Sequence, residues 1–150
     1  MILTSLQPLP EKIELQDEKN LLIQGLPSSV EKQFSKFFFA KNVTPLLKIK
    51  KIDFALVFAV NQKQLADILK DVVPVLQSDA KLWIAYPKVT SKIVSDLSRD
   101  NNWEFISNYG LEFVRQVALD NVWTAVRFKK PEIISIKVNK LNRSAVKASL

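Results

Sequence analysis

The residues best suited to chemistry gather where an apolar stretch turns polar, in "WIAYPKVTSK" at residues 83–92. Pro87 ends the apolar run, and two hydroxyl groups and an ammonium follow it, the donors that a phosphate or a carboxylate needs. A later turn, "LDNVW", adds a carboxylate and an indole ring. The predicted site is an anion site formed by Lys88, Thr90, Ser91, Asp120 and Trp123, with the tryptophan as one wall.

Each of these residues also has a purely structural interpretation. Pro87 can simply end a strand, and Trp123 can pack on the rim of a sheet rather than stack on a ligand. Asp96 and Asp120 can neutralise the nearby lysines in a structural network. Residues 88–97 then form a loop, with Ser98 capping a following helix. The sequence leaves both interpretations open.

Many chemistries are excluded by composition. The chain has no histidine and no cysteine, which removes Ser-His-Asp and Cys-His nucleophiles and the usual zinc and iron ligand sets. With only two glycines, Gly25 and Gly110, it contains neither a G-x-G-x-x-G nor a Walker loop. We therefore predict no catalytic residue, no metal site and no cofactor, and the sequence favours a protein that is not an enzyme.

The elements that position these residues alternate between apolar strands and helical patterns. Strands are predicted at residues 21–25, 54–60 and 81–86, with a weak edge strand at 43–51, where Pro45 cannot donate to a ladder. The run "FALVFAV" is uniformly apolar, which is typical of a strand covered on both faces.

Helices are predicted between these strands. The first spans residues 29–40 and is capped by Ser28 or Ser29, and the second starts at Asn61 and extends to residue 77, with Pro74 tightening its last turn. A further long helical region ends at Gly110.

The last two apolar runs, residues 111–119 and 122–130, indicate a hairpin. The turn between them contains Asp120 and Asn121, which tolerate the left-handed backbone of tight turns. Parallel strands joined by helices and ended by a hairpin predict a three-layer Rossmann-like α/β sandwich, with a mostly parallel sheet closed by a C-terminal antiparallel hairpin. In such a sheet, ligands bind outside the carboxyl ends of the strands, which is where the predicted site lies.

This strand order resembles the C-terminal half of Rossmann-type class I methyltransferases. In those enzymes the first strand runs into a glycine-rich loop, whereas this chain has "QGLPSSV" there. The resemblance implies a methyltransferase-like topology without the glycine-rich cofactor loop. A diverged enzyme that still binds a nucleoside cofactor is the alternative that it leaves open.

A second resemblance rests on "LWIAYPKVTSKIVSDLSRD" and "LDNVWTAVRF". These stretches are similar to a family of small uncharacterised bacterial proteins catalogued as a domain of unknown function, over about residues 13–130. The matching positions are Tyr86, Pro87, Lys88, Thr90, Ser91, Asp96, Leu97, Ser98, Asp120, Trp123 and Thr124. The family's Ala-Pro after the first strand is replaced by Leu26 and Pro27. The resemblance implies a methyltransferase-related fold without an assigned activity.

Length and charge indicate one domain, residues 1–130, followed by a basic extension, residues 131–150. Of the formal charge of +7, most comes from the end of the chain, since residues 121–150 carry seven basic residues and one acidic residue. The extension can meet nucleic acid or an acidic surface, or can simply be a solvated tail, which the sequence favours. Its last part, residues 141–150, is predicted to be poorly ordered.

The first residues carry neither early basic charge nor an apolar h-region, and the longest apolar run is residues 54–60, so we predict a cytoplasmic protein without a membrane span. The function that the sequence favours is a non-catalytic module that binds a small anion or a protein partner. A homodimer through an edge strand, at residues 43–50 or 131–138, is also compatible with the sequence.

Overall fold

In the part of the chain that the structure describes, the apolar runs form one five-stranded sheet with the strand order β1-β2-β3-β5-β4. The computed structural model describes residues 8–42, 51–97, 103, 106 and 108–130. The first three strands are parallel, β5 is antiparallel to β3, and β4 is antiparallel to β5. Their bounds are β1 (Leu21–Gln24), β2 (Ile52–Phe58), β3 (Leu76–Pro87), β4 (Glu112–Ala118) and β5 (Trp123–Lys129). This arrangement confirms the predicted fold class.

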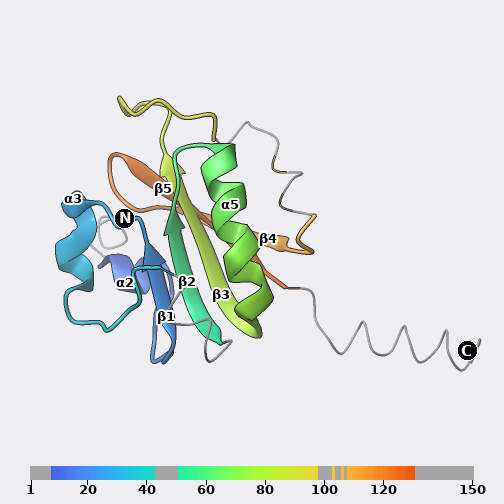
Figure 1. Ribbon diagram of the computed structural model, residues 1–150. Coiled ribbons are helices and arrows are strands. Elements are labelled where there is room, and N and C mark those ends of the chain that lie inside the picture. Colours follow the sequence, from blue (N-terminus) through green and yellow to red (C-terminus); the bar gives the residue numbers. More distant parts are fainter. Residues whose placement is uncertain (1–7, 43–50, 98–102, 104–105, 107, 131–150) are drawn as a thin grey trace, which may run out of the picture.

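Helices cover both faces of the sheet, which gives three layers (Figure 1). On one face lies α5 (Gln62–Val72), and on the other lie α2 (Leu9–Lys12) and α3 (Ser28–Glu31) followed by η1 (Lys32–Phe34). Alternate residues of each strand face the two layers, so Ile84 belongs to the α5 side and Trp83 to the opposite side. Trp83 is fully buried, which confirms it as a core residue.

The predicted helix at 29–40 is wrong in its length and its cap. Helical structure ends at Phe34, and the residue before the helix is Pro27, which makes no side-chain capping bond. Aromatic residues lose side-chain freedom in a helix, and Phe37, Phe38 and Phe39 come in succession here. Val30 and Phe34 are buried in the core, whereas Phe38, which a longer helix would also turn toward the sheet, is 99% exposed.

The second helix begins as predicted and ends earlier. Asn61 caps α5 by accepting a hydrogen bond from the backbone N–H of Gln64, at 2.7 Å. The helix stops at Val72, and Pro74 tightens the chain into η2 (Val73–Val75), as predicted. The following strand is longer than predicted, since β3 begins at Leu76, where it pairs with Ile52.

The C-terminal hairpin is confirmed, with one irregularity. The register between β4 and β5 shifts between Phe113 and Arg115, so β4 contains a bulge. Because β4 is the last strand of the sheet, this bulge lies at an edge.

Several predicted features lie outside the described residues. These are most of the weak strand at 43–51, most of the helical region that ends at Gly110, the cap at Ser98 and the basic extension at 131–150. Among the residues that are described, no helix combines the length and the hydropathy that crossing a membrane requires.

The strand order reverses between β1 and β2, because Ala40 pairs with the outer edge of β1. Ala40 forms a parallel bridge with Leu22, its N–H donating to the Leu21 carbonyl and its carbonyl accepting from Ile23. After β1 the chain therefore first pairs with one edge of that strand at Ala40, and it later forms β2 along the opposite edge. In open α/β sheets the ligand crevice lies outside the carboxyl ends of the strands at such a reversal, here β1 and β2.

Candidate functional site

The rim at the carboxyl ends of the parallel strands brings the predicted site residues together. β5 begins beside the end of β3, with Trp123 paired to Pro87. The Lys88 N–H donates to the Val122 carbonyl at 2.7 Å, which ties the loop after β3 to the hairpin turn. Lys88, Asp120 and Trp123 therefore lie at one edge of the sheet, and Thr90 and Ser91 lie in the loop that leaves it.

Asp120 is occupied by the backbone of its own turn. Its Oδ1 accepts hydrogen bonds from the N–H groups of Val122, at 2.8 Å, and Trp123, at 2.7 Å. This carboxylate replaces the left-handed backbone that we predicted for the turn, because neither Asp120 nor Asn121 has a positive φ.

Trp123 is a packing residue of the rim. It is 7% exposed and meets Phe58 edge to face, with ring centroids 5.1 Å apart. The indole therefore contributes to the core beneath the rim, as its structural interpretation predicted.

The hydroxyl-bearing loop is not helical. Residues 88–97 form turns and bends, which confirms the rim loop predicted there. Ser91 Oγ accepts a hydrogen bond from the Ile93 N–H at 3.3 Å, whereas Thr90 is exposed.

At the ends of β1 and β2 the chain packs closely against itself and engages its own backbone donors. Gly25, at φ 76°, passes so close to β2 that an added Cβ would lie 3.0 Å from the Phe58 carbonyl oxygen. The N–H groups of the first turn of α5 are also engaged, because Gln62 donates to Asp96 Oδ1 at 2.7 Å and Gln64 donates to Asn61. Asp96 thus supplies from within the chain the negative charge that a helix N-terminus favours.

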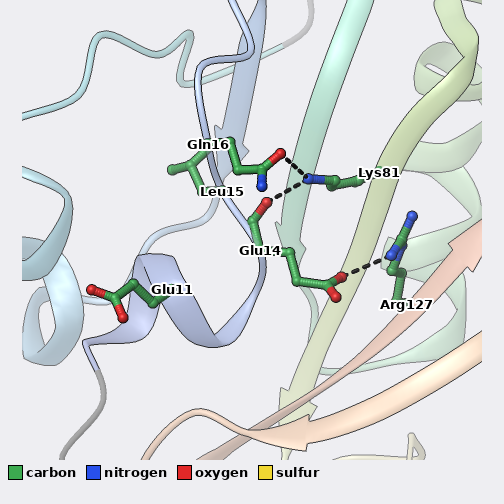
Figure 2. Close-up of a pocket in the computed structure, with 6 residues that line it drawn as sticks. All are labelled: Glu11, Glu14, Leu15, Gln16, Lys81 and Arg127. Atoms are coloured by element: carbon green, nitrogen blue, oxygen red, sulfur yellow. Dashed lines mark hydrogen bonds and ion pairs between the residues drawn. The ribbon is translucent and has the colours of Figure 1, made fainter.

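A polar pocket of about 400 Å³ lies far from this rim, on the face of the sheet covered by α2 (Figure 2). Lys81 of β3 pairs with Phe54 six residues before the end of the strand, which places it about 20 Å from the rim. The wall opposite the sheet is the segment that follows α2. The polar pocket is lined by Glu11, Glu14, Leu15, Gln16, Lys81 and Arg127.

Glu14 connects this segment to three strands. Its carboxylate accepts hydrogen bonds from Arg127, at 2.7 Å, and from Arg115, at 2.9 Å, and its backbone carbonyl accepts one from Lys81. Glu14 is also the non-glycine residue with a positive φ, 63°, among the residues that the structure describes. These bonds hold a backbone conformation that an L-residue rarely adopts.

Lys81 is fully engaged at the edge of the polar pocket. Its ammonium forms an ion pair with Glu18 at 2.9 Å, and both side chains are mostly buried. Burial alone raises the pKa of Glu18, but hydrogen bonds from Lys81 and from backbone N–H groups, with the attraction of the Lys81 charge, outweigh it. The pKa of Glu18 is therefore lowered.

Arg127 has an N–H donor without an acceptor among the described residues. One terminal nitrogen binds Glu14, but its Nε is buried without an acceptor among the described residues. Trp83 lies directly opposite Arg127 in the sheet, and its buried indole N–H also has no acceptor among the described residues. Buried donors without acceptors are uncommon and costly, so these two nitrogens mark a place where an acceptor is missing.

Sequence reasoning missed the polar pocket. A signal was present, since Lys81 and Arg127 lie next to the apolar runs of β3 and β5 at positions that face a covered side of the sheet. Their carboxylate partners come from a loop far away in the sequence. The described residues contain no group of three His, Cys, Asp or Glu side chains placed to hold a metal ion.

Comparison with known proteins gives structural likenesses alone. No family model matches the chain, and no curated protein matches it. The mitomycin 7-O-methyltransferase MmcR aligns with a TM-score of 0.52 at 12% identity, over 85% of this chain and 54% of that one. An SAM-dependent methyltransferase from Aquifex aeolicus aligns with a TM-score of 0.52 at 12% identity, over 80% of this chain and 86% of that one.

A protein of the NADB-Rossmann superfamily from Streptococcus agalactiae aligns with a TM-score of 0.51 at 14% identity, over 85% of this chain and 69% of that one. The fold is methyltransferase-like. Identities this low show the fold and nothing beyond it, and this chain spans about half the length of MmcR.

The role of Asp120 yields a stability prediction. Replacing Asp120 with alanine leaves two N–H groups at a partly buried turn without their acceptor, so Asp120→Ala lowers the free energy of unfolding by about 1–3 kcal/mol. Asp120→Asn is the matched control, because its amide oxygen still accepts. Urea denaturation measures both, and an alanine variant as stable as the wild type contradicts the assignment.

The lowered pKa of Glu18 gives a pH dependence. Because the folded-state pKa lies below the unfolded value of about 4.3, ionised Glu18 stabilises the fold above that pH, and this contribution is lost as the pH falls through the folded pKa. Glu18→Gln should therefore be less stable than the wild type at pH 7, with a difference that shrinks in acid. The exposed Glu31, which forms no ion pair with a described residue, provides the control Glu31→Gln. A difference between wild type and Glu18→Gln that is constant from pH 7 to pH 3 in urea denaturation contradicts this account.

Proposed function

We propose that this chain is a non-catalytic binding module whose polar pocket holds a small ligand by an anionic group. The observation that carries the proposal is the buried Nε of Arg127, which has no acceptor among the described residues. A guanidinium offers donors in a fixed planar fork that matches a carboxylate or a phosphate. Glu14 takes one terminal nitrogen and leaves Nε without an acceptor, so an anion that reaches the guanidinium from the polar pocket can supply one.

The size and charge of the polar pocket suit a small molecule. Its volume of about 400 Å³ falls within the range of small-ligand sites. Lys81 and Glu18 neutralise one another at one side, so the pocket has no large excess of either charge. Recognition therefore depends on the geometry of Arg127 more than on net attraction.

The non-catalytic part of the proposal rests on composition and on the loop that follows β1. The chain lacks histidine and cysteine, and Gly25 lies directly against Phe58 where a nucleoside cofactor enters related sheets. The methyltransferase-like fold leaves a diverged enzyme that binds a nucleoside cofactor as the alternative.

The rim site at Lys88, Thr90 and Ser91 is our second choice for the anion. Asp120, Ser91 and Asp96 already accept backbone N–H groups there, and Trp123 is buried beneath it. The cytoplasmic location, the homodimer, nucleic-acid binding through residues 131–150 and membership of the bacterial family stay predictions from the sequence.

Inorganic phosphate and acetate are the probes that test whether the polar pocket binds an anion. Each is titrated against the wild type by calorimetry, and we expect saturable binding at millimolar concentration. Arg127→Lys keeps the positive charge but loses the planar fork, and we expect binding to weaken at least about tenfold. Arg115→Lys is the matched control, because Arg115 binds the same carboxylate without lining the polar pocket.

Two results contradict the proposal. One is the absence of binding by either probe to the wild type at millimolar concentration. The other is an equal loss in Arg127→Lys and Arg115→Lys, which indicates a general effect of the ion-pair network. If Lys88→Ala abolishes binding and Arg127→Lys does not, the anion binds at the rim instead.

The enzymatic alternative is tested with S-adenosylmethionine. The loop after β1 has Pro27 and further side chains where a glycine-rich loop lets the backbone approach a cofactor, so we expect no saturable heat when S-adenosylmethionine is titrated into the protein. S-adenosylhomocysteine serves as a second probe of the same crevice. Binding of either compound at micromolar concentration contradicts the non-catalytic proposal and supports the diverged enzyme.

A further inference from the structure

A second pocket lies on the opposite face of the sheet and is built from aromatic side chains. Tyr86 comes from β3, Phe113 and Gln116 from β4, and Val126 and Phe128 from β5, while Trp103 lies in the connection before β4. We call it the aromatic pocket. It is separate from the polar pocket because Phe128 and Arg127 alternate along β5 and face opposite sides.

The four rings form walls at different angles. Tyr86 and Trp103 are tilted by 54° with centroids 5.4 Å apart, and Trp103 and Phe128 are tilted by 44° at 6.0 Å. Phe113 meets Phe128 at 80°, with centroids 6.4 Å apart. Two parallel rings form a slot for a flat group such as a nucleobase, whereas tilted walls form a box for a compact, rounded group.

The volume narrows the class of ligand. The aromatic pocket measures about 130 Å³, room for about four water molecules. Drug-sized ligands and cofactors need at least about 300 Å³, so only a small group or the head of a longer molecule can enter. Phe113 is 62% exposed, so such a head can enter from the solvent side.

Among the described residues the lining carries no charged side chain, and its polar groups are the Gln116 amide, the Tyr86 hydroxyl and the Trp103 indole N–H. Aromatic faces attract cations through their quadrupole, and boxes of several rings are well suited to methylated ammonium groups. An unmethylated ammonium is strongly hydrated and needs three acceptors, which this lining does not provide. We propose that the aromatic pocket binds the head of a methylated ammonium compound.

Choline and its neutral isostere dimethylbutanol, in which carbon replaces the nitrogen, are the probes that test this. The aromatic pocket should bind choline saturably in the millimolar range, with dimethylbutanol and ethanolamine at least about tenfold weaker. The chain has a formal charge of +7 and therefore repels the choline cation. Salt screens this repulsion, so added salt should not weaken choline binding. Tighter binding of trimethyllysine than of choline assigns the head to a protein side chain, and the reverse assigns it to a free metabolite.

Variants of Phe113 locate the site. Phe113→Leu keeps an apolar side chain but removes the π face, and we expect choline to bind about three- to tenfold more weakly, while Phe113→Trp keeps the affinity. Phe38→Leu is the matched control, because Phe38 is almost fully exposed and lines neither pocket. Unfolding curves confirm that each variant is folded.

The proposal is overturned by any of three results. These are no choline binding to the wild type, equal binding of choline and dimethylbutanol, or equal binding by Phe113→Leu and the wild type. The second result identifies a merely hydrophobic pocket. None of them bears on phosphate binding at Arg127, so the two proposals fail separately.

Discussion

The layer that covers one face of the sheet depends on the contacts of Glu14. One carboxylate receives two guanidinium groups from neighbouring antiparallel strands, and the carbonyl of the same residue receives the Lys81 ammonium from the adjacent strand. Charge-assisted bonds of this kind are stronger than neutral ones, and they offset the left-handed backbone at Glu14. They hold the segment that follows α2 over the sheet, which allows Leu9 and Ile13 to stay buried there. The polar pocket is the space that remains beside these contacts.

Features that local sequence determines could be predicted. The apolar run that forms most of β2, the Asn61 cap and the tightening at Pro74 each follow from residues within one element. The predicted helix at 29–40 was too long because a tertiary contact outweighs the local pattern. Ala40 pairs with β1 in a parallel bridge and so cannot continue the helix. The polar pocket could not be predicted, because Glu14 and Arg127 are 113 positions apart and no local pattern encodes their meeting. The residues of the predicted rim site converge as the topology required, but the sequence could not tell which of their polar atoms the backbone would occupy.

The rim and the polar pocket differ in how their polar groups are satisfied. At the rim, Asp96, Ser91 and Asp120 accept hydrogen bonds from backbone N–H groups, so these polar side chains are paired within the chain. In the polar pocket the opposite holds, because Arg127 is positioned and partly neutralised but keeps a buried donor.

The bulge in β4 has a consequence for how this protein behaves among its own copies. An edge strand presents unpaired N–H and C=O groups that can recruit another strand, and a regular, flat edge invites growth into fibrils. The irregular register between Phe113 and Arg115 interrupts that repeat in the middle of the strand, and Arg115, whose side chain is 47% exposed, adds a charge beside it. Within the described part of the chain, these two features make the edge beside the aromatic pocket a poor template for the regular stacking of strands from other copies.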